Sequence, residues 1–247
     1  MGGDGLKAIR IGILVFLSLF LVAAIFVCHH RVVSASYTPV TGPVTLILDA
    51  GHGGEDGGAT TPSGQRESDI NLRIVQKMDF LLSFCGINAV LTRSDDCSIH
   101  DPDCVTLHEK KVSDLKNRVS IVNSHENAIF ISVHQNSFTD PAYSGFQVFY
   151  NTGDLSRQWG ERTQELLQQT VDSSNHRKAK ILSDTVYLFR HIDCPSILVE
   201  CGFLSNAEEA ALLLTDHYQK QFAVALTGSC LRQLGIMESF SGGETIG

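Results

Sequence analysis

The sequence predicts an α/β fold, a single domain with a mostly parallel, twisted sheet of about six strands and helices on both faces. Short apolar runs typical of buried strands alternate with longer segments whose apolar residues recur at helical spacing. This alternation favours parallel strands, because each helix returns the chain to the start of the next strand. The chain has 247 residues, enough for one domain with a sizeable core.

Residues 1–35 are predicted to lie outside this domain as a membrane anchor. Residues 11–28 carry no charged side chain, and Lys7 and Arg10 precede them. An apolar run of this length can just cross a bilayer, and basic residues before it favour an N-in, C-out orientation. A cleaved signal peptide is the alternative, because residues 33–35 are small, as at a cleavage site. Either way, the rest of the chain is expected to be exported.

The first half of the predicted domain follows a short linker at 36–43. An apolar run at 44–48 predicts the first strand, and a glycine-rich loop comes after it. Glu67 opens a predicted helix that runs to about Phe84, with apolar residues every three or four positions. The next predicted elements are a strand at 87–92, a polar insertion at 94–107, a helix at 113–123 and a strand at 129–133.

The second half is predicted to contain three strands and three helices, and the whole domain spans 44–236. Asn206-Ala-Glu-Glu209 resembles a capping box, in which the first and fourth residues exchange hydrogen bonds at the start of a helix. A glycine-rich tail at 237–247 is expected to be flexible. The other predicted elements are strands at 146–150, 186–189 and 196–200 and helices at 155–172 and 217–234.

Charge and cysteine content limit the possible functions. The net charge is −8, and residues 1–35 are more basic than acidic, so the exported part is more acidic still. Such a domain is a poor candidate for binding nucleic acid. The seven cysteines form no CxxC pair, which argues against a cysteine zinc site. Cys97 and Cys104 flank the polar insertion; a disulfide between them and two free thiols are both compatible with the sequence.

Three predicted strands end in residues that can bind metal or transfer protons. The run at 44–48 leads into a glycine-rich turn with His52, the run at 129–133 is followed by His134, and the run at 196–199 by Glu200. In an open parallel sheet, ligand sites form at the carboxyl ends of the strands. We therefore expect these three residues to converge.

His52, Glu67 and His134 together predict a zinc site. Two neutral imidazoles and one carboxylate are a common ligand set of catalytic zinc, which leaves a fourth position for water. Glu67 is expected at the N-terminus of a helix just beyond the loop of His52, where the helix dipole also favours a carboxylate. An ordinary acidic residue in the first turn is the alternative for Glu67.

Glu200 is the predicted catalytic base, because a carboxylate after apolar strand residues is costly unless it is paired or functional. It would take a proton from water activated by zinc and return it to the leaving nitrogen. The alternative is a structural ion pair with Arg93 or Arg118. Asn136, close behind His134, is a candidate for substrate binding, and a loop-capping role is equally compatible.

Four blocks of the sequence resemble the zinc-dependent N-acetylmuramoyl-L-alanine amidases of the amidase-3 family. The blocks are Leu48-Asp-Ala-Gly-His-Gly-Gly, Glu67, Ser132-Val-His-Gln-Asn136 and Val199-Glu-Cys-Gly-Phe-Leu-Ser-Asn206. The resemblance covers about 44–234. It implies a six-stranded sheet between helices, one zinc ion on His52, Glu67 and His134, and a catalytic Glu200. The implied reaction cleaves the amide between the lactyl group of N-acetylmuramic acid and L-alanine of the stem peptide.

Within that family, the chain is most similar to the germination-specific, CwlD-type amidases of spore formers. The similarity rests on the single N-terminal apolar segment, the absence of wall-binding repeats, and the blocks at 114–118 and 177–180. It implies a role in forming muramic-δ-lactam in spore cortex, with peptidoglycan as substrate and the protein anchored outside the membrane, between the forespore membranes in sporulating cells. An activating lipoprotein or other protein partner is compatible with it.

Other classes of function stay open from the sequence. A general vegetative cell-wall amidase would carry the same residues. A catalytically silent wall-binding module would lack a ligand or the base, whereas all four residues are present. A zinc exopeptidase often needs a second metal, and only one ligand set is visible.

Overall fold

The structure, a computed structural model, describes residues 44–235. Its centre is a six-stranded sheet in the order β2-β1-β3-β6-β4-β5. β1, β2, β3 and β6 run parallel, β4 is antiparallel to β6, and β5 is parallel to β4. The predicted mostly parallel sheet is confirmed. The strands are β1 (Thr45–Ala50), β2 (Val90–Leu91), β3 (Ala128–Asn136), β4 (Gln147–Tyr150), β5 (Lys180–Ile181) and β6 (Ser196–Phe203).

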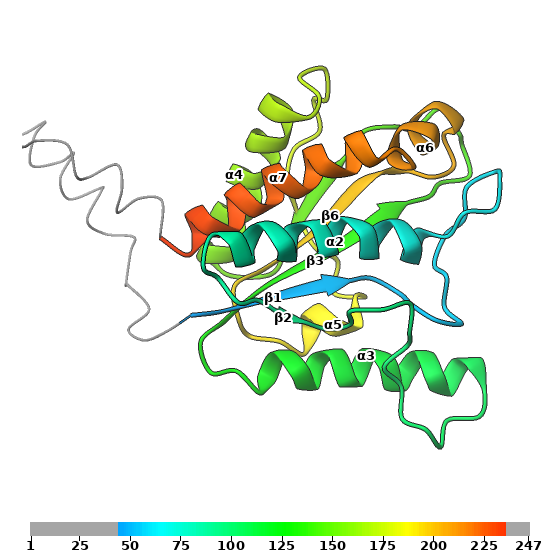
Figure 1. Cartoon of the computed structure of the whole chain (residues 1–247), viewed down its shortest axis with the longest axis vertical. Coiled ribbons are helices and arrows are strands. Elements are labelled where there is room, and N and C mark those ends of the chain that lie inside the picture. Colours follow the sequence, from blue (N-terminus) through cyan, green and yellow to red (C-terminus); the bar gives the residue numbers. More distant parts are fainter. Residues whose placement is uncertain (1–43, 236–247) are drawn as a thin grey trace, which may run out of the picture. The chain divides into compact units, whose positions relative to one another are not determined.

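Helices cover both faces of the sheet, as predicted (Figure 1). One face packs against α2, α4 and α7, and the other against α3 and α5. The described helices are α2 (Glu67–Phe84), α3 (Leu107–Asn123), α4 (Asp154–Thr170), α5 (Tyr187–Arg190), α6 (Ala207–Leu213) and α7 (Asp216–Gln233).

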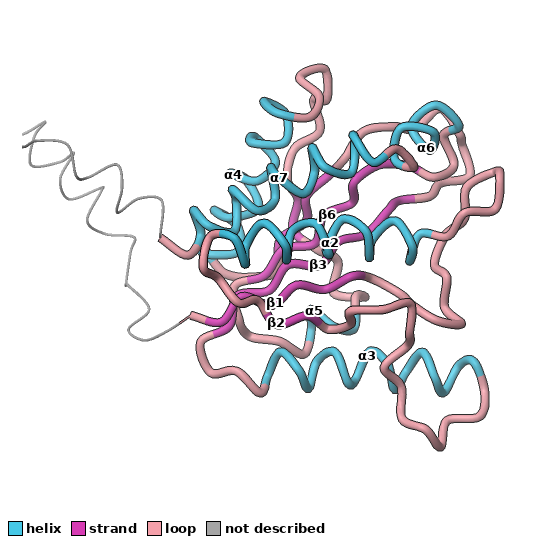
Figure 2. The backbone as a smooth tube through the Cα atoms, in the orientation of Figure 1, coloured by secondary structure: helices cyan, strands magenta, loops and turns pink. Residues whose placement is uncertain are grey.

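Strand residues alternate between two hydrophobic cores, because successive side chains point to opposite faces. Leu46 and Leu48 of β1 join the core beneath α2, whereas Ile47 joins the core beneath α3. His134 and Glu200 lie in register as partners on β3 and β6. The loops that follow β1, β3 and β6 gather at one edge of the sheet, where these strands end (Figure 2).

The prediction of a strand at 186–189 is wrong, because Val186 caps the short helix α5 and the next three residues belong to that helix. A short apolar run does not by itself distinguish a strand from a buried helical turn. Leu188 and Phe189 are adjacent and both buried, which a helical turn permits and a strand with one covered face does not. β5 was not expected in the basic stretch before it.

One helix start and one capping box differ from the prediction. α3 begins at Leu107, because Thr106 and Glu109 form a complete capping box. At α6, the Asn206 side chain caps the helix as expected. Glu209 does not return the bond; its carboxylate accepts from the backbone N–H groups of Gly145 and Phe203 at 2.8 and 2.7 Å.

The predicted anchor and linker at 1–43 and the tail at 237–247 lie outside the described residues. Within 44–235, no helix combines the length and apolar character needed to span a bilayer. Cys97 and Cys104 are free thiols in this structure.

A buried ion pair fixes the end of β1. Asp49 and Arg118 are each only 2% exposed, and the Arg118 guanidinium donates to the Asp49 carboxylate. Thr92, directly after β2, and Ser132 on β3 donate to the same carboxylate at 2.6 and 2.5 Å. Burial alone would raise the pKa of Asp49, but Arg118 and these hydroxyls hold it below its usual value. Asp49 is therefore ionised and fully bonded.

Arg118 also holds the turn that follows β1. It donates to the carbonyl oxygens of Ala50 at 3.0 Å and His52 at 2.8 Å. Arg93 donates to Ala50 O at 2.9 Å and Gly51 O at 3.2 Å. Two buried guanidinium groups thus bind three successive carbonyls and set the path of this turn.

Replacing Arg118 with methionine is expected to lower the free energy of unfolding by about 3–5 kcal/mol, because it leaves a buried carboxylate unpaired. Urea unfolding monitored by circular dichroism measures this. The control is Lys110→Met, which breaks an exposed pair with Glu55 and should leave the unfolding midpoint nearly unchanged. Equal losses in the two variants would contradict a special role for the buried pair.

Candidate active site

His52 lies in a tight turn directly after β1. Its φ of 62° is in the left-handed region, and no other non-glycine residue between 44 and 235 has a positive φ. Histidine adopts this region more readily than most residues, but still with some strain. Its imidazole Nδ1 lies 3.0 Å from Asp56 Oδ2, and its Nε2 lies 3.4 Å from Glu67 Oε1. Asp56 therefore fixes the side of the ring that faces away from Glu67.

Glu67 is the first residue of α2 and is only 3% exposed. Its Oε2 accepts from the backbone N–H of Ala59 at 2.9 Å, and its Oε1 from that of Gln135 at 3.1 Å. Asn71, one turn along α2, donates to Oε1 at 3.3 Å. These fixed donors orient the carboxylate toward the two histidines.

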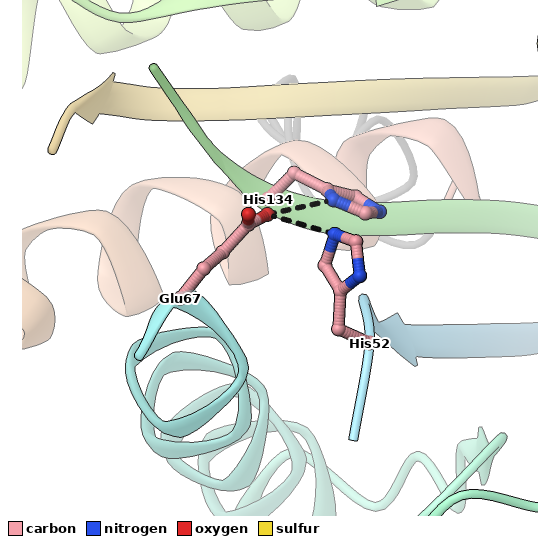
Figure 3. A group of neighbouring side chains, drawn as sticks. All are labelled: His52, Glu67 and His134. Carbon is pink, nitrogen blue, oxygen red and sulfur yellow. Dashed lines mark hydrogen bonds and ion pairs between the residues drawn. The ribbon is translucent and has the colours of Figure 1, made fainter. Parts of the chain in front are cut away.

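His134 completes the group from the end of β3. Its Nδ1 lies 2.9 Å from Glu67 Oε1, and its ring lies 5.0 Å from that of His52 in an edge-to-face arrangement (Figure 3). The potential ligand atoms of His52, Glu67 and His134 all lie within 4.8 Å of one another. Among residues 44–235, no other histidine, cysteine or carboxylate cluster has this geometry.

The group fits a zinc ion by both chemistry and placement. Two imidazole nitrogens and a carboxylate oxygen are ligands that zinc prefers, and three protein ligands are typical of catalytic sites. Burial opposes the charged form of His52, but hydrogen bonds to Asp56 and Glu67 outweigh it and raise its pKa to about 10. Burial also opposes ionisation of Glu67, yet the two histidines hold its pKa far below the usual value. The cluster thus keeps a carboxylate ionised where a cation would bind.

Two glycines leave the space that these side chains occupy. A Cβ on Gly51 would lie 2.2 Å from the His134 ring. A Cβ on Gly58 would lie 2.5 Å from Glu67 Oε2 and 2.7 Å from the His52 ring. The glycine-rich loop therefore provides the room for the ligands as well as the turn that delivers His52.

Glu200 lies beside the cluster on β6. Its Oε2 is buried and has no hydrogen-bond partner within the described part of the chain. Burial raises the pKa of Glu200 to about 7, with a smaller upward effect of Glu67 and an opposing effect of His134. The alternative ion pair with Arg93 or Arg118 is absent here, because those guanidinium groups bind Asp49 and backbone carbonyls instead.

Asn136 is the last residue of β3, two positions beyond His134 on the same face of the strand. Its backbone carbonyl accepts from Leu204 N at 2.8 Å, which ties β3 to the residue after β6. The side chain is half-buried at the catalytic edge. This position is compatible with contact to a substrate, and the structure does not assign it a capping role.

Sequence reasoning missed several residues that support the site. Asp56 holds His52, whereas Asn71 and Gln135 surround Glu67. A buried aspartate in an apolar strand, Asp49, was the signal for the ion pair with Arg118. No motif marks Asp56, Asn71 or Gln135: Asp56 bonds His52 within the same turn, Asn71 bonds Glu67 one turn along α2, and Gln135 bonds Glu67 from β3.

An α/β domain with a His-Glu-His cluster and an unpaired carboxylate at the ends of its parallel strands is the arrangement of a metal-assisted hydrolase. The chain belongs to the N-acetylmuramoyl-L-alanine amidases, whose family model matches residues 46–230. The resemblance to the amidase-3 family is confirmed. The reaction is hydrolysis of the amide between N-acetylmuramic acid and L-alanine in peptidoglycan.

Several individual amidases are similar to this chain in sequence or in structure. The chain is 32% identical over 196 residues to the germination-specific N-acetylmuramoyl-L-alanine amidase of Bacillus subtilis, covering 78% of this chain and 81% of the relative. It is similar to the CwlD amidase of Clostridioides difficile, solved in complex with the GerS lipoprotein, with a TM-score of 0.74 and 38% identity over 78% of this chain and 98% of that one. The amidase AmiC2 of Nostoc punctiforme has a TM-score of 0.64 and 30% identity, with coverage of 78% and 98%.

Gly51→Ala is expected to reduce zinc content by displacing His134 while leaving the fold intact, because the added Cβ clashes with a half-exposed ring at the edge of the sheet. Metal analysis of the purified protein measures the loss. The matched control is Gly228→Ala on α7, where a Cβ meets no atom within 4 Å. Equal zinc content in the two variants would show that Gly51 does not set the position of His134.

Glu200→Gln is expected to stabilise the metal-free protein at neutral and alkaline pH. The folded pKa of about 7 lies above the ordinary value of 4.5, so ionising Glu200 costs stability as pH rises from about 4.5 to 7. The variant avoids this cost, which amounts to at most about 3 kcal/mol above pH 7 and vanishes below 4.5. Urea unfolding of both proteins in chelator across pH 4 to 8 tests it; a stability difference independent of pH would contradict it.

Proposed function

We propose that this amidase is zinc-dependent, with His52, Glu67 and His134 as the zinc ligands and Glu200 as the group that moves the proton. The observation that supports this most directly is Glu200, whose buried Oε2 has no hydrogen-bond partner among residues 44–235 and which pairs in register with His134 of the cluster. Such a group costs stability and is rare unless it has a function. Bound zinc would supply a Lewis acid that polarises the scissile carbonyl and lowers the pKa of water.

The environment of Glu200 suits transfer of a proton in both directions. A group with a pKa of about 7 is partly ionised at neutral pH, so it can accept a proton from the attacking water. It can then donate that proton to the nitrogen of L-alanine as the amide bond breaks. In this proposal, Asn136 at the end of β3 donates its side-chain amide to the substrate.

The cellular role that we propose is removal of stem peptides in spore cortex, so that muramic-δ-lactam can form. Similarity to the germination-specific amidase of Bacillus subtilis and to CwlD of Clostridioides difficile supports this role. The apolar segment at 11–28 supports export and anchoring on the outer side of the membrane, between the forespore membranes. Cortex that keeps its muramic-δ-lactam after deletion of the gene would argue against the role.

A protein partner is part of the proposal. CwlD of Clostridioides difficile was solved in complex with the GerS lipoprotein, and its chain is 38% identical to this one. We infer that a lipoprotein or another extracytoplasmic protein also binds this amidase, and that it activates the enzyme. Copurification from sporulating cells, with and without crosslinking, would test the inference.

Glu200→Gln is expected to lower kcat at least about 100-fold while changing KM little, because the proton transfer is lost and the binding surface is kept. The assay uses the purified full chain, added zinc and cortex-type peptidoglycan, with mass spectrometry of the released peptides beginning at L-alanine. Glu161→Gln, on the exposed side of α4, is the control and should behave as wild type. Unchanged kcat in Glu200→Gln with normal zinc content would exclude Glu200 as the proton carrier.

A further inference from the structure

Arg177 lies in the loop before β5 and is fixed on three sides. Its Nε donates to the carbonyl of Ser144 at 3.0 Å, and its Nη1 donates to Gln147 Oε1 at 3.3 Å. The guanidinium carbon lies 4.9 Å above the centre of the Phe203 ring, as in a cation–π contact. A long side chain held in this way is pre-organised rather than freely mobile.

The strand register places Arg177 close to the catalytic carboxylate. Gln147 on β4 is the direct antiparallel partner of Glu200 on β6. Directly opposed residues share a face of the sheet, with Cβ atoms about 4.5–5.5 Å apart. Gln147 also donates to Lys178 O at 2.8 Å, which holds the loop against the strand. Arg177 is therefore separated from Glu200 by one side chain.

The guanidinium group of Arg177 can bind an anion, because part of it makes no hydrogen bond to the described residues. Its Nη2 makes no hydrogen bond within residues 44–235, and the described ion pairs do not include Arg177. The nearby Glu209 carboxylate is already bonded to two backbone N–H groups. Arg177 forms no ion pair with a carboxylate among the described residues, although Glu209 is near enough for the charge of Arg177 to oppose the rise in the pKa of Glu209 that burial causes. Its fork geometry matches a carboxylate.

Exposed aromatic side chains continue this surface. Phe138 and Tyr143 are 52% and 46% exposed, and their rings lie 4.8 Å apart. Tyr143 in turn lies 6.2 Å from Phe203, the ring beneath Arg177. Phe203 is in register with Asn136 at the end of β3. The aromatic surface thus runs from the catalytic edge to the guanidinium group.

We propose that Arg177, supported by Gln147 and Phe203, binds a free carboxylate of the stem peptide and makes this amidase selective for stems in which that carboxylate is not amidated. The inference rests on the proposed function, since it assigns a substrate group to the same site. In this proposal the carboxylate belongs to the residue that follows L-alanine in the stem peptide. Phe138 and Tyr143 would flank the peptide without contributing charge.

The test compares two synthetic substrates with the zinc-loaded full chain. Both are N-acetylmuramoyl-L-alanyl peptides with a γ-linked D-glutamyl residue, one with a free α-carboxylate and the other with an α-carboxamide. Arg177→Gln is expected to raise KM for the carboxylate substrate roughly tenfold or more, as for loss of a charge-assisted bond. KM for the carboxamide and kcat for both should stay within about twofold. Arg177→Lys should keep part of the preference.

The matched control is Lys178→Gln, which removes the same charge from the next residue and should leave both substrates unaffected. Equal loss on both substrates in Arg177→Gln would mean that Arg177 only positions the loop, and no loss would mean that it makes no contact; either result overturns the proposal. Calorimetric binding of the two released peptides to the same proteins gives a second readout. Selective binding of the carboxylate peptide by a wild type that hydrolyses neither substrate would overturn the proposed function and leave this inference standing.

Discussion

The catalytic edge of this domain depends on the buried pair of Asp49 and Arg118. A buried ion pair is costly to desolvate and stabilises only when its remaining donors and acceptors are also bonded. Here Asp49 accepts from β3 and from the residue directly after β2, and Arg118 donates to the turn that follows β1. One interaction therefore joins three strands and α3 to the backbone that positions His52. The pair thereby holds the strained turn that carries His52 in a fixed position relative to the sheet.

The four residues of the candidate site come from separate elements of the fold. His52 comes from the turn after β1, Glu67 from the start of α2, His134 from β3 and Glu200 from β6. The arrangement holds features that weaken a fold, including a left-handed histidine and a buried carboxylate with an unbonded oxygen. Such features persist where the surroundings determine them and where function needs them. Here the hydrogen bonds to Glu67 and His52 hold these strained and buried groups in place.

The main layout of fold and site followed from the sequence because it depends on local patterns. Apolar runs located β1, β3 and β6, and the rule that parallel strands place their ends at one edge brought His52, His134 and Glu200 together. The partners of these residues were not accessible in the same way. Arg118 and Asp49 are far apart in the chain, and nothing near either residue states which partner it takes. The helix α5 was mistaken for a strand because its apolar run has no distinguishing period.

The reversed direction of β4 explains why the catalytic edge extends beyond the parallel strands. A parallel strand beside β6 would end at this edge, and its loop would leave toward solvent. As an antiparallel strand, β4 begins there instead, so its first residue, Gln147, lies directly against Glu200. The loop before β5 returns to the same place, since β5 runs parallel to β4. Residues that follow α4, Arg177 among them, are thereby brought to the edge that holds His52 from the turn after β1, Glu67 from α2 and His134 from β3. The topology thus separates the His-Glu-His cluster, which lies on one side of Glu200, from Gln147 and Arg177 on the other.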